Sequence, residues 1–445
     1  MRMQLLIMIG LALFVRSAAA QEPTTTKTLG ECIAIAVGNH PSLKAADASI
    51  EAGSQRVREA VSNYLPQINA LYAANRRQSS PAVLTGAQTQ NNCTTVNGQT
   101  VCAAMSSPTF NFYNTGFNLT QILFDFGQNL NTIRAAQASE QSLAADRSTQ
   151  FDTVVLNAKQ AYFNVLAARR LLAVADETVR QNQKHLEQAQ GRFNVGVAAK
   201  FDVTQAQVQV AQAELNQVTA RNNVAIARET LRNALGLTSP IDFDIVDNFD
   251  VHAVAITEEQ ALAMAYDKRP EVQSIQAQER STTEQIKSLQ KNYLPNVTGN
   301  GNYYWSGSDY PLQSNWNIGA SVNLSLFNGG LTTAQVGEQR ANLLNLKYNE
   351  EVLRQNIALE VRQAVLNLQQ AGESIRVSEK GLQQARENLD LAEGRYGTGV
   401  GNIIELTDAQ VLLTTAEANY VQALYSYKTA VAALEKATAQ QLATE

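Results

Sequence analysis

Two acidic residues near the end of the chain are the first candidates for functional chemistry. Glu405 and Asp408 are three positions apart, so a helix would place both carboxylates on one face. Such a pair attracts cations. The alternative is helix capping, because Asn402 with Glu405 and Asp202 with Gln205 both match the capping-box pattern. Capping accounts for Glu405 but not for Asp408, so the acidic pair stays a candidate site.

The cysteines are the second group of reactive side chains. Cys93 and Cys102 lie in a polar segment, where an oxidising compartment would join them in a local disulfide that fixes a loop. Cys32 lies on an amphipathic helical pattern and is predicted to be a buried, small, apolar residue.

The other residue types argue against catalysis and against nucleic-acid binding. The three histidines are far apart in sequence, and none has metal-ligand spacing to a cysteine or to another histidine. No nucleophile–base set or phosphate-binding loop rises above chance, so we predict no enzyme, no metal and no cofactor. The 445 residues carry a net charge of −5 without a recurring basic patch, and a nucleic-acid partner is not expected.

The N-terminal segment 1–20 resembles an export signal. Arg2 precedes an apolar run from Leu5 to Val15, and Ala18-Ala19-Ala20 offers a small-residue cleavage site. The alternative is a membrane-anchoring helix, but the apolar run is too short for one. We therefore predict a cleaved signal peptide over 1–20.

The rest of the chain repeats itself. Tyr-Leu-Pro occurs at 64–66 and again at 293–295, and Leu-Phe occurs at 123–124 and again at 326–327. The two motifs lie farther apart in the first half than in the second. This difference marks an insertion at a loop tip of the first half, where extra length costs little. The predicted domains are a first repeat over 21–235, an equatorial linker over 236–257 and a second repeat over 258–445.

Each repeat contains one predicted β-hairpin, at 65–126 and at 294–329. Alternate residues from Trp316 to Leu326 are apolar, and those between them, from Asn317 to Ser325, are polar or glycine. A hairpin over a soluble core is the alternative. The aromatic run from Tyr303 to Trp305 instead suits a membrane interface, so we favour a membrane protein of mixed α and β class.

Four strands cannot close a transmembrane barrel by themselves, because single-chain barrels begin at eight strands. Exposed sheet edges are excluded in lipid, so copies of the chain must combine their strands. A dimer would give eight strands and a trimer twelve. The polar inner face favours the wider, twelve-stranded barrel.

Very long helices follow the hairpins. The helical pattern runs from Gln128 to Gly191 and again from Leu331 to Gly394, each roughly 95 Å at 1.5 Å per residue. Shorter helices return after tip turns at 192–201 and 395–404, and one more helix is predicted over 258–291. A solid coiled coil is the alternative. Abundant Asn and Gln favour helices that form a wet inner wall.

The order and double occurrence of these motifs resemble the TolC-type outer-membrane efflux family. The tip sequences Arg192-Phe193-Asn194-Val195-Gly196 and Arg395-Tyr396-Gly397-Thr398-Gly399 carry the resemblance most specifically. It covers nearly the whole chain after the signal. It implies a homotrimer in the outer membrane, with a twelve-stranded barrel continued by a periplasmic helical barrel. It also implies docking to an inner-membrane pump through a periplasmic adaptor.

The resemblance also implies roles for tip residues. Glu405 and Asp408 would form the acidic ring of a periplasmic gate, and Asp202 and Tyr396 would make the contacts that hold it closed. The best-studied family members carry Arg where Gly401 stands here, so one closing contact is missing. The implied adaptor-docking residues are Val195, Gly196, Val197, Thr398, Gly399 and Val400.

The function that these observations favour is a passive exit duct of a tripartite efflux pump or a type I secretion system. The alternative is a trimeric surface adhesin or structural coiled-coil stalk without conduction. Duplicated hairpins and paired tip motifs argue against that alternative. The sequence does not indicate whether the cargo is a drug, a metal ion or a secreted polypeptide.

Overall fold

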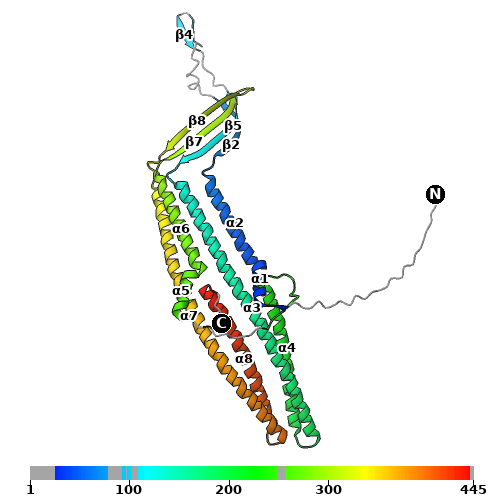
Figure 1. The fold of residues 1–445 in the computed structure, drawn as a ribbon. Coiled ribbons are helices and arrows are strands. Elements are labelled where there is room, and N and C mark those ends of the chain that lie inside the picture. Colours follow the sequence, from blue (N-terminus) through cyan, green and yellow to red (C-terminus); the bar gives the residue numbers. More distant parts are fainter. Residues whose placement is uncertain are drawn as a thin grey trace, which may run out of the picture. The chain divides into compact units, whose positions relative to one another are not determined.

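A computed structural model describes residues 26–78, 93–96, 98–102, 109–247, 254 and 256–440 (Figure 1). They form two compact units. The sheet unit comprises Ser42–Gln150 and Glu259–Val361. The tip unit comprises residues up to Pro41, Phe151–Glu258 and the chain from Arg362 onward. The predicted signal peptide over 1–20 lies outside the described residues.

The helices of the sheet unit lead into and out of a single sheet. The single helix predicted over 258–291 is wrong, because Pro270 forces Arg269 into an extended conformation with ψ 126°. Arg269 is only 4% exposed and pairs with Glu271 at 2.7 Å and Glu360 at 2.5 Å.

None of the helices in the described ranges combines the length and hydropathy needed to cross a bilayer. The helices with residues in this unit are α2 (Pro41–Ser62), α3 (Gln128–Asn194), α5 (Glu258–Lys268), α6 (Pro270–Gln290) and α7 (Leu331–Thr398), with a short 3₁₀ turn at Lys291–Tyr293.

The sheet has four antiparallel strands in the order β2-β5-β7-β8 (Figure 1). The strands are β2 (Gln67–Gln78), β5 (Thr109–Phe124), β7 (Asn296–Gly307) and β8 (Gln313–Asn323). β2 and β8 are the edges. The alternation predicted as far as Leu326 holds only to the end of β8 at Asn323. Residues 324–328 follow as an irregular connection to α7.

The two faces of the sheet differ in chemistry, as the alternation predicted. Ile68, Leu119 and Ile318 lie in one cross-strand row, and Ile318 is 81% exposed. The other face carries an asparagine row with one member on each strand. The members are Asn69, Asn118, Asn302 and Asn317, each directly opposite the next.

Side-chain amides link most of the asparagine row. Asn118 Nδ2 donates to Asn302 Oδ1 at 2.6 Å, and Asn302 Nδ2 donates to Asn317 Oδ1 at 2.7 Å. Thr120 supports the row by donating its hydroxyl to Asn118 Oδ1 at 3.1 Å. The polar face is therefore ordered by its own hydrogen bonds.

The inserted loop of the first hairpin contains a short ribbon of β3 (Cys93–Val96) and β4 (Gln99–Cys102). Its antiparallel register places Cys93 directly opposite Cys102. Opposed residues have Cα atoms about 4.5–5.5 Å apart, within the range that a disulfide spans.

We predict that Cys93 and Cys102 are disulfide-bonded in the exported protein. Mass mapping without reduction should find the two peptides joined, and replacing both cysteines by serine should leave channel conductance unchanged because the bond only tethers a loop. Free thiols at both positions would contradict this assignment. Cys32 is an internal control, because it is buried and burial raises the pKa of its thiol to about 11.

The tip unit consists of helical hairpins and part of the linker. Its β1 and β6 pair in parallel, and Tyr162 on α3 donates its hydroxyl to the Val246 carbonyl at 2.5 Å. Arg170 pairs with Asp247 at 2.9 Å, so the described linker is fastened to α3. The elements lying wholly in this unit are β1 (Thr26–Lys27), α1 (Leu29–Asn39), α4 (Lys200–Ala234), β6 (Asp244–Ile245) and α8 (Ile403–Thr438). The later parts of α3 and α7 belong to it as well.

Element positions agree with the repeat seen in the sequence. The offset that carries the start of β2 onto the start of β7 also carries the end of β2 onto the end of β7, and it carries α1 onto α5. One second offset carries the starts of α3 and α4 onto the starts of α7 and α8. Corresponding sequence segments therefore form elements of the same type. The helices and the first strands match closely in length, whereas β5 has 16 residues and β8 has 11.

Candidate functional site at the helix tips

The hairpin of α7 and α8 is held together by apolar residues at heptad spacing. Leu382, Leu389 and Tyr396 follow one another at heptad intervals on α7 and are buried against Leu406 and Leu413 of α8. This packing fixes how the last turns of α7 and the first turns of α8 are presented at the tip.

The turn between these helices contains two glycines, Gly399 and Gly401. Gly399 has φ +80°, a left-handed conformation that ends α7. The amides of Val400 and Gly401 both donate to the Arg395 carbonyl, at 3.1 and 2.9 Å. A Cβ on Gly401 would lie 3.0 Å from the Arg395 Cβ, so the turn leaves little room for the arginine that the resemblance implies at this position.

The predicted acidic pair lies on the exposed face of the first turns of α8. Asn402 caps the helix by accepting from the Glu405 amide at 2.9 Å. The Glu405 carboxylate accepts from Arg395 Nε at 3.3 Å, in an exposed pair that contributes little stability. Asp408 is exposed and forms no hydrogen bond or ion pair with any described residue. Capping therefore explains Asn402, and Asp408 is left with an uncompensated charge.

The tip between α3 and α4 is built differently. α4 begins at Lys200, and its N-cap Ala199 has no side chain that can accept a hydrogen bond. The capping interpretation of Asp202 is therefore wrong, because Asp202 lies inside the first turn of the helix. Gly196 ends the α3 side with φ +79°.

Tyr396 is the most buried of the predicted site residues, at 2% exposure. The Arg192 guanidinium lies 4.8 Å from the centre of its ring and also donates to its backbone carbonyl. The Tyr396 hydroxyl has no hydrogen-bond partner among the described residues. Burial raises the pKa of Tyr396, the Asp202 charge raises it further, and Arg192 opposes both. Asp202 therefore acts on Tyr396 through its charge and not through a hydrogen bond.

The predicted docking residues form the ends of the two hairpins. Val195 is 73% exposed, Val400 is 72% exposed and Val197 is also exposed. The Thr398 hydroxyl donates to the Gly394 and Arg395 carbonyls, both at 3.1 Å, and closes the last turn of α7. Each tip thus combines a glycine turn with exposed valine side chains.

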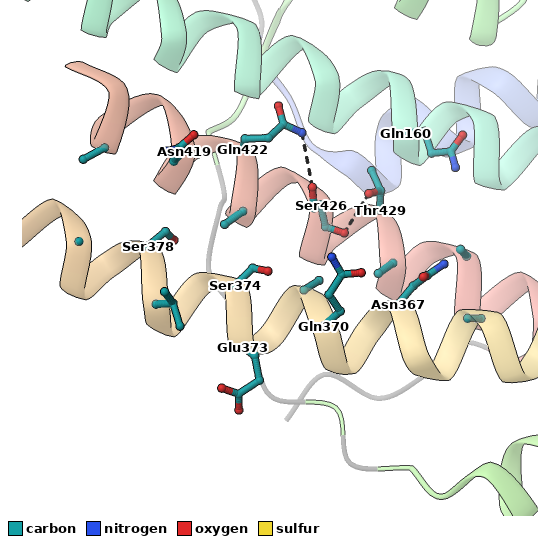
Figure 2. A pocket seen from close by; sticks show the side chains of 18 residues that line it. Gln160, Asn367, Gln370, Glu373, Ser374, Ser378, Asn419, Gln422, Ser426 and Thr429 are labelled. Atoms are coloured by element: carbon teal, nitrogen blue, oxygen red, sulfur yellow. Dashed lines mark hydrogen bonds between the residues drawn. The ribbon is translucent and has the colours of Figure 1, made fainter. Parts of the chain in front are cut away.

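A cavity of about 980 Å³ lies between α7 and α8, with Gln160 of α3 reaching its rim (Figure 2). Small and uncharged polar residues predominate in it. Gln422 donates to the Ser426 hydroxyl at 3.4 Å, and the Thr429 hydroxyl donates to the Ser426 carbonyl at 3.0 Å. The lining can hold water but offers no cluster of three metal-ligating side chains within the described residues.

Comparison with known proteins identifies the family of this chain. The model of the outer membrane efflux protein family matches residues 32–237 and 261–440. The chain belongs to this family. Outer membrane protein TolC of Escherichia coli K12 is 28% identical over 447 residues, covering 96% of this chain and 84% of TolC.

Solved structures of membrane proteins share the fold. A membrane protein from Pseudomonas aeruginosa gives a TM-score of 0.79 at 20% identity, covering 93% of this chain and 91% of that one. The CmeC outer membrane channel of Campylobacter jejuni gives 0.78 at 17% identity, covering 99% and 95%. The predicted family is confirmed, and the chain is an outer-membrane efflux protein.

Sequence reasoning about this family member missed three tip contacts. Arg192 and Arg395 stand in the repeated tip motif, yet one stacks on Tyr396 and the other pairs with Glu405. His185 on α3 is buried, and its Nε2 atom lies 3.8 Å from Oε1 of Glu393. Burial lowers the pKa of this histidine. Only the repeated arginine was visible in the sequence, and its two different partners depend on tertiary packing.

Proposed function

We propose that three copies of this chain form a channel-tunnel in the outer membrane that serves as the passive exit duct of a tripartite efflux pump or type I secretion system. The observation that carries the trimer is the four-stranded sheet with an apolar face, a polar face and two edge strands. Edges cannot remain unpaired in lipid, and three copies give the twelve strands that enclose a pore.

The helices supply the periplasmic extension of the duct in this proposal. The matching element positions support an internal duplication, in which each half contributes one hairpin of strands and one helical tip. The exposed tip residues Val195, Gly196, Val197, Thr398, Gly399 and Val400 would meet a periplasmic adaptor, which connects the duct to an inner-membrane pump.

The gate in this proposal lies at the same tips. Three copies bring six carboxylates of Glu405 and Asp408 around one axis, where they attract cations. The structure adds that each Glu405 has an arginine beside it, so Asp408 carries most of the uncompensated charge. In this proposal Tyr396 and Asp202 make the contacts that keep the gate closed. The Arg192 guanidinium stacks on the Tyr396 ring, and the Asp202 charge raises the pKa of Tyr396.

The purified protein is expected to be a trimer in detergent and to conduct ions in planar bilayers. Light scattering with correction for bound detergent gives the mass, and bilayer recording gives the conductance. A stable folded monomer would contradict the trimer. A trimer without conductance would favour the structural stalk.

A further inference from the structure

The two edge strands of the sheet limit how neighbouring copies can pair. Within the described residues, β2 and β8 each pair on one side only. In the proposed trimer, on which this inference rests, β8 of one copy must pair with β2 of the next. The open question is which residues lie opposite each other across this seam.

The asparagine row cannot continue straight across the seam. It runs perpendicular to the strands, because its members are directly opposite one another. Barrel strands tilt about 35–45° from the barrel axis, so a perpendicular row climbs along that axis. Crossing four strands covers about 19 Å. Threefold symmetry requires that equivalent residues of all copies lie at the same height along the barrel axis. The pairing of β8 with the next β2 must therefore be displaced from the straight row by about four to six residues along the strand.

The chemistry of the two faces limits this shift to even numbers. An odd shift would place the polar residues of β8 beside the apolar residues of β2. The seam therefore differs from the straight row by four or six positions in one direction or the other.

Strand length selects among these choices. β2 has 12 residues and β8 has 11. If Asn317 faces Ala73, four positions beyond Asn69, every residue of β8 has a partner within β2. The other registers pair fewer residues of β8 with residues of β2. Shifting by four positions in the opposite direction leaves three pairs, continuing the row straight leaves seven, and placing Asn317 six positions beyond Asn69 leaves ten. Unpaired backbone groups are costly in lipid, so the complete pairing is favoured.

The complete pairing keeps like faces together, as every even shift does. On the polar face it places Asn315 opposite Asn75 and Ser321 opposite Asn69. On the apolar face it places Val322 opposite Ile68. Pairs of matching chemistry stabilise neighbouring strands.

We propose that β8 of one copy pairs with β2 of the next in the register that sets Ser321 opposite Asn69 and Asn323 opposite Gln67. The ends of both strands that adjoin the helices are then level. The three asparagine rows become three separate oblique segments on the inner face, each displaced by four positions from its neighbour.

Double-cysteine variants test this register in the full-length trimer. The background carries Cys93→Ser and Cys102→Ser, and the test variant adds Asn69→Cys with Ser321→Cys. Oxidation should join it into covalent trimers on non-reducing gels, because directly opposed residues are within disulfide range. The matched control, Asn69→Cys with Asn317→Cys, should stay largely monomeric on the gel, because a displacement of four positions separates its thiols by about 14 Å.

The possible results of this experiment distinguish the proposed register from its alternatives. Crosslinking of the control but not of the test variant overturns the register and favours a straight seam. A trimer by light scattering in which neither variant crosslinks overturns the register while the proposed trimer stands. A folded monomer overturns both.

Discussion

Channels with alanine at both Glu405 and Asp408 are expected to lose block by trivalent cations added on the side of the helix tips. A cation within roughly 6 Å of a carboxylate gains about 3 kcal/mol per unit charge at an effective dielectric constant of about 20, which is about a hundredfold in affinity. Asp408→Ala alone should weaken block more than Glu405→Ala, because the Glu405 carboxylate already has Arg395 at 3.3 Å.

Single-channel recording in planar bilayers measures this block. The matched control is Gln205→Ala, at the position of the first tip that corresponds to Asp408, which carries no charge and should leave block unchanged. Light scattering verifies that each variant remains a trimer. If the double variant is blocked as strongly as the parent, the acidic pair is not the cation site.

Tyr396→Ala is expected to raise the resting conductance and to lower the melting temperature. The ring is buried between α7 and α8 and lies under the Arg192 guanidinium, and truncating a buried aromatic side chain costs about 3–5 kcal/mol. Tyr396→Phe should keep both properties near the parent, because the hydroxyl makes no hydrogen bond to a described residue that could be lost.

The control for this second prediction is Phe193→Ala, at the corresponding position of the first tip. Phe193 is 43% exposed, so its truncation should change little. Conductance without added cations and a thermal melt in detergent are the two measurements. If Tyr396→Phe opens the channel as strongly as Tyr396→Ala, a hydroxyl contact with Asp202 closes the gate, and stacking on Arg192 does not.

Much of the fold could be predicted because local patterns dominate it. The helical patterns and the alternating strands are properties of single segments, and the fixed offsets follow from comparing the two halves of the sequence. The break at Arg269 was missed although Pro270 is visible, because apolar periodicity continues on both sides of it. The strand order was not accessible either, since the contact of β5 with β7 joins segments far apart in sequence.

The candidate site shows the same limit at the level of side chains. Glycine turns and the exposed acidic face follow from spacing, so Gly399 and Asp408 could be selected from the sequence. The repeated tip motif gave Arg192 and Arg395 the same appearance. Their partners differ because the first tip has Phe193 where the second has the buried Tyr396.

The asparagine row has a consequence for how reliably the sheet is assembled. A strand that slips by one position turns its apolar side chains to the wrong face and is strongly penalised. A slip of two positions keeps both faces intact, so face chemistry alone does not oppose it. Such a slip would separate Asn118 from Asn302 and break the chain of amide hydrogen bonds. The asparagine row therefore opposes slips by an even number of positions, which the alternation of apolar and polar residues does not oppose.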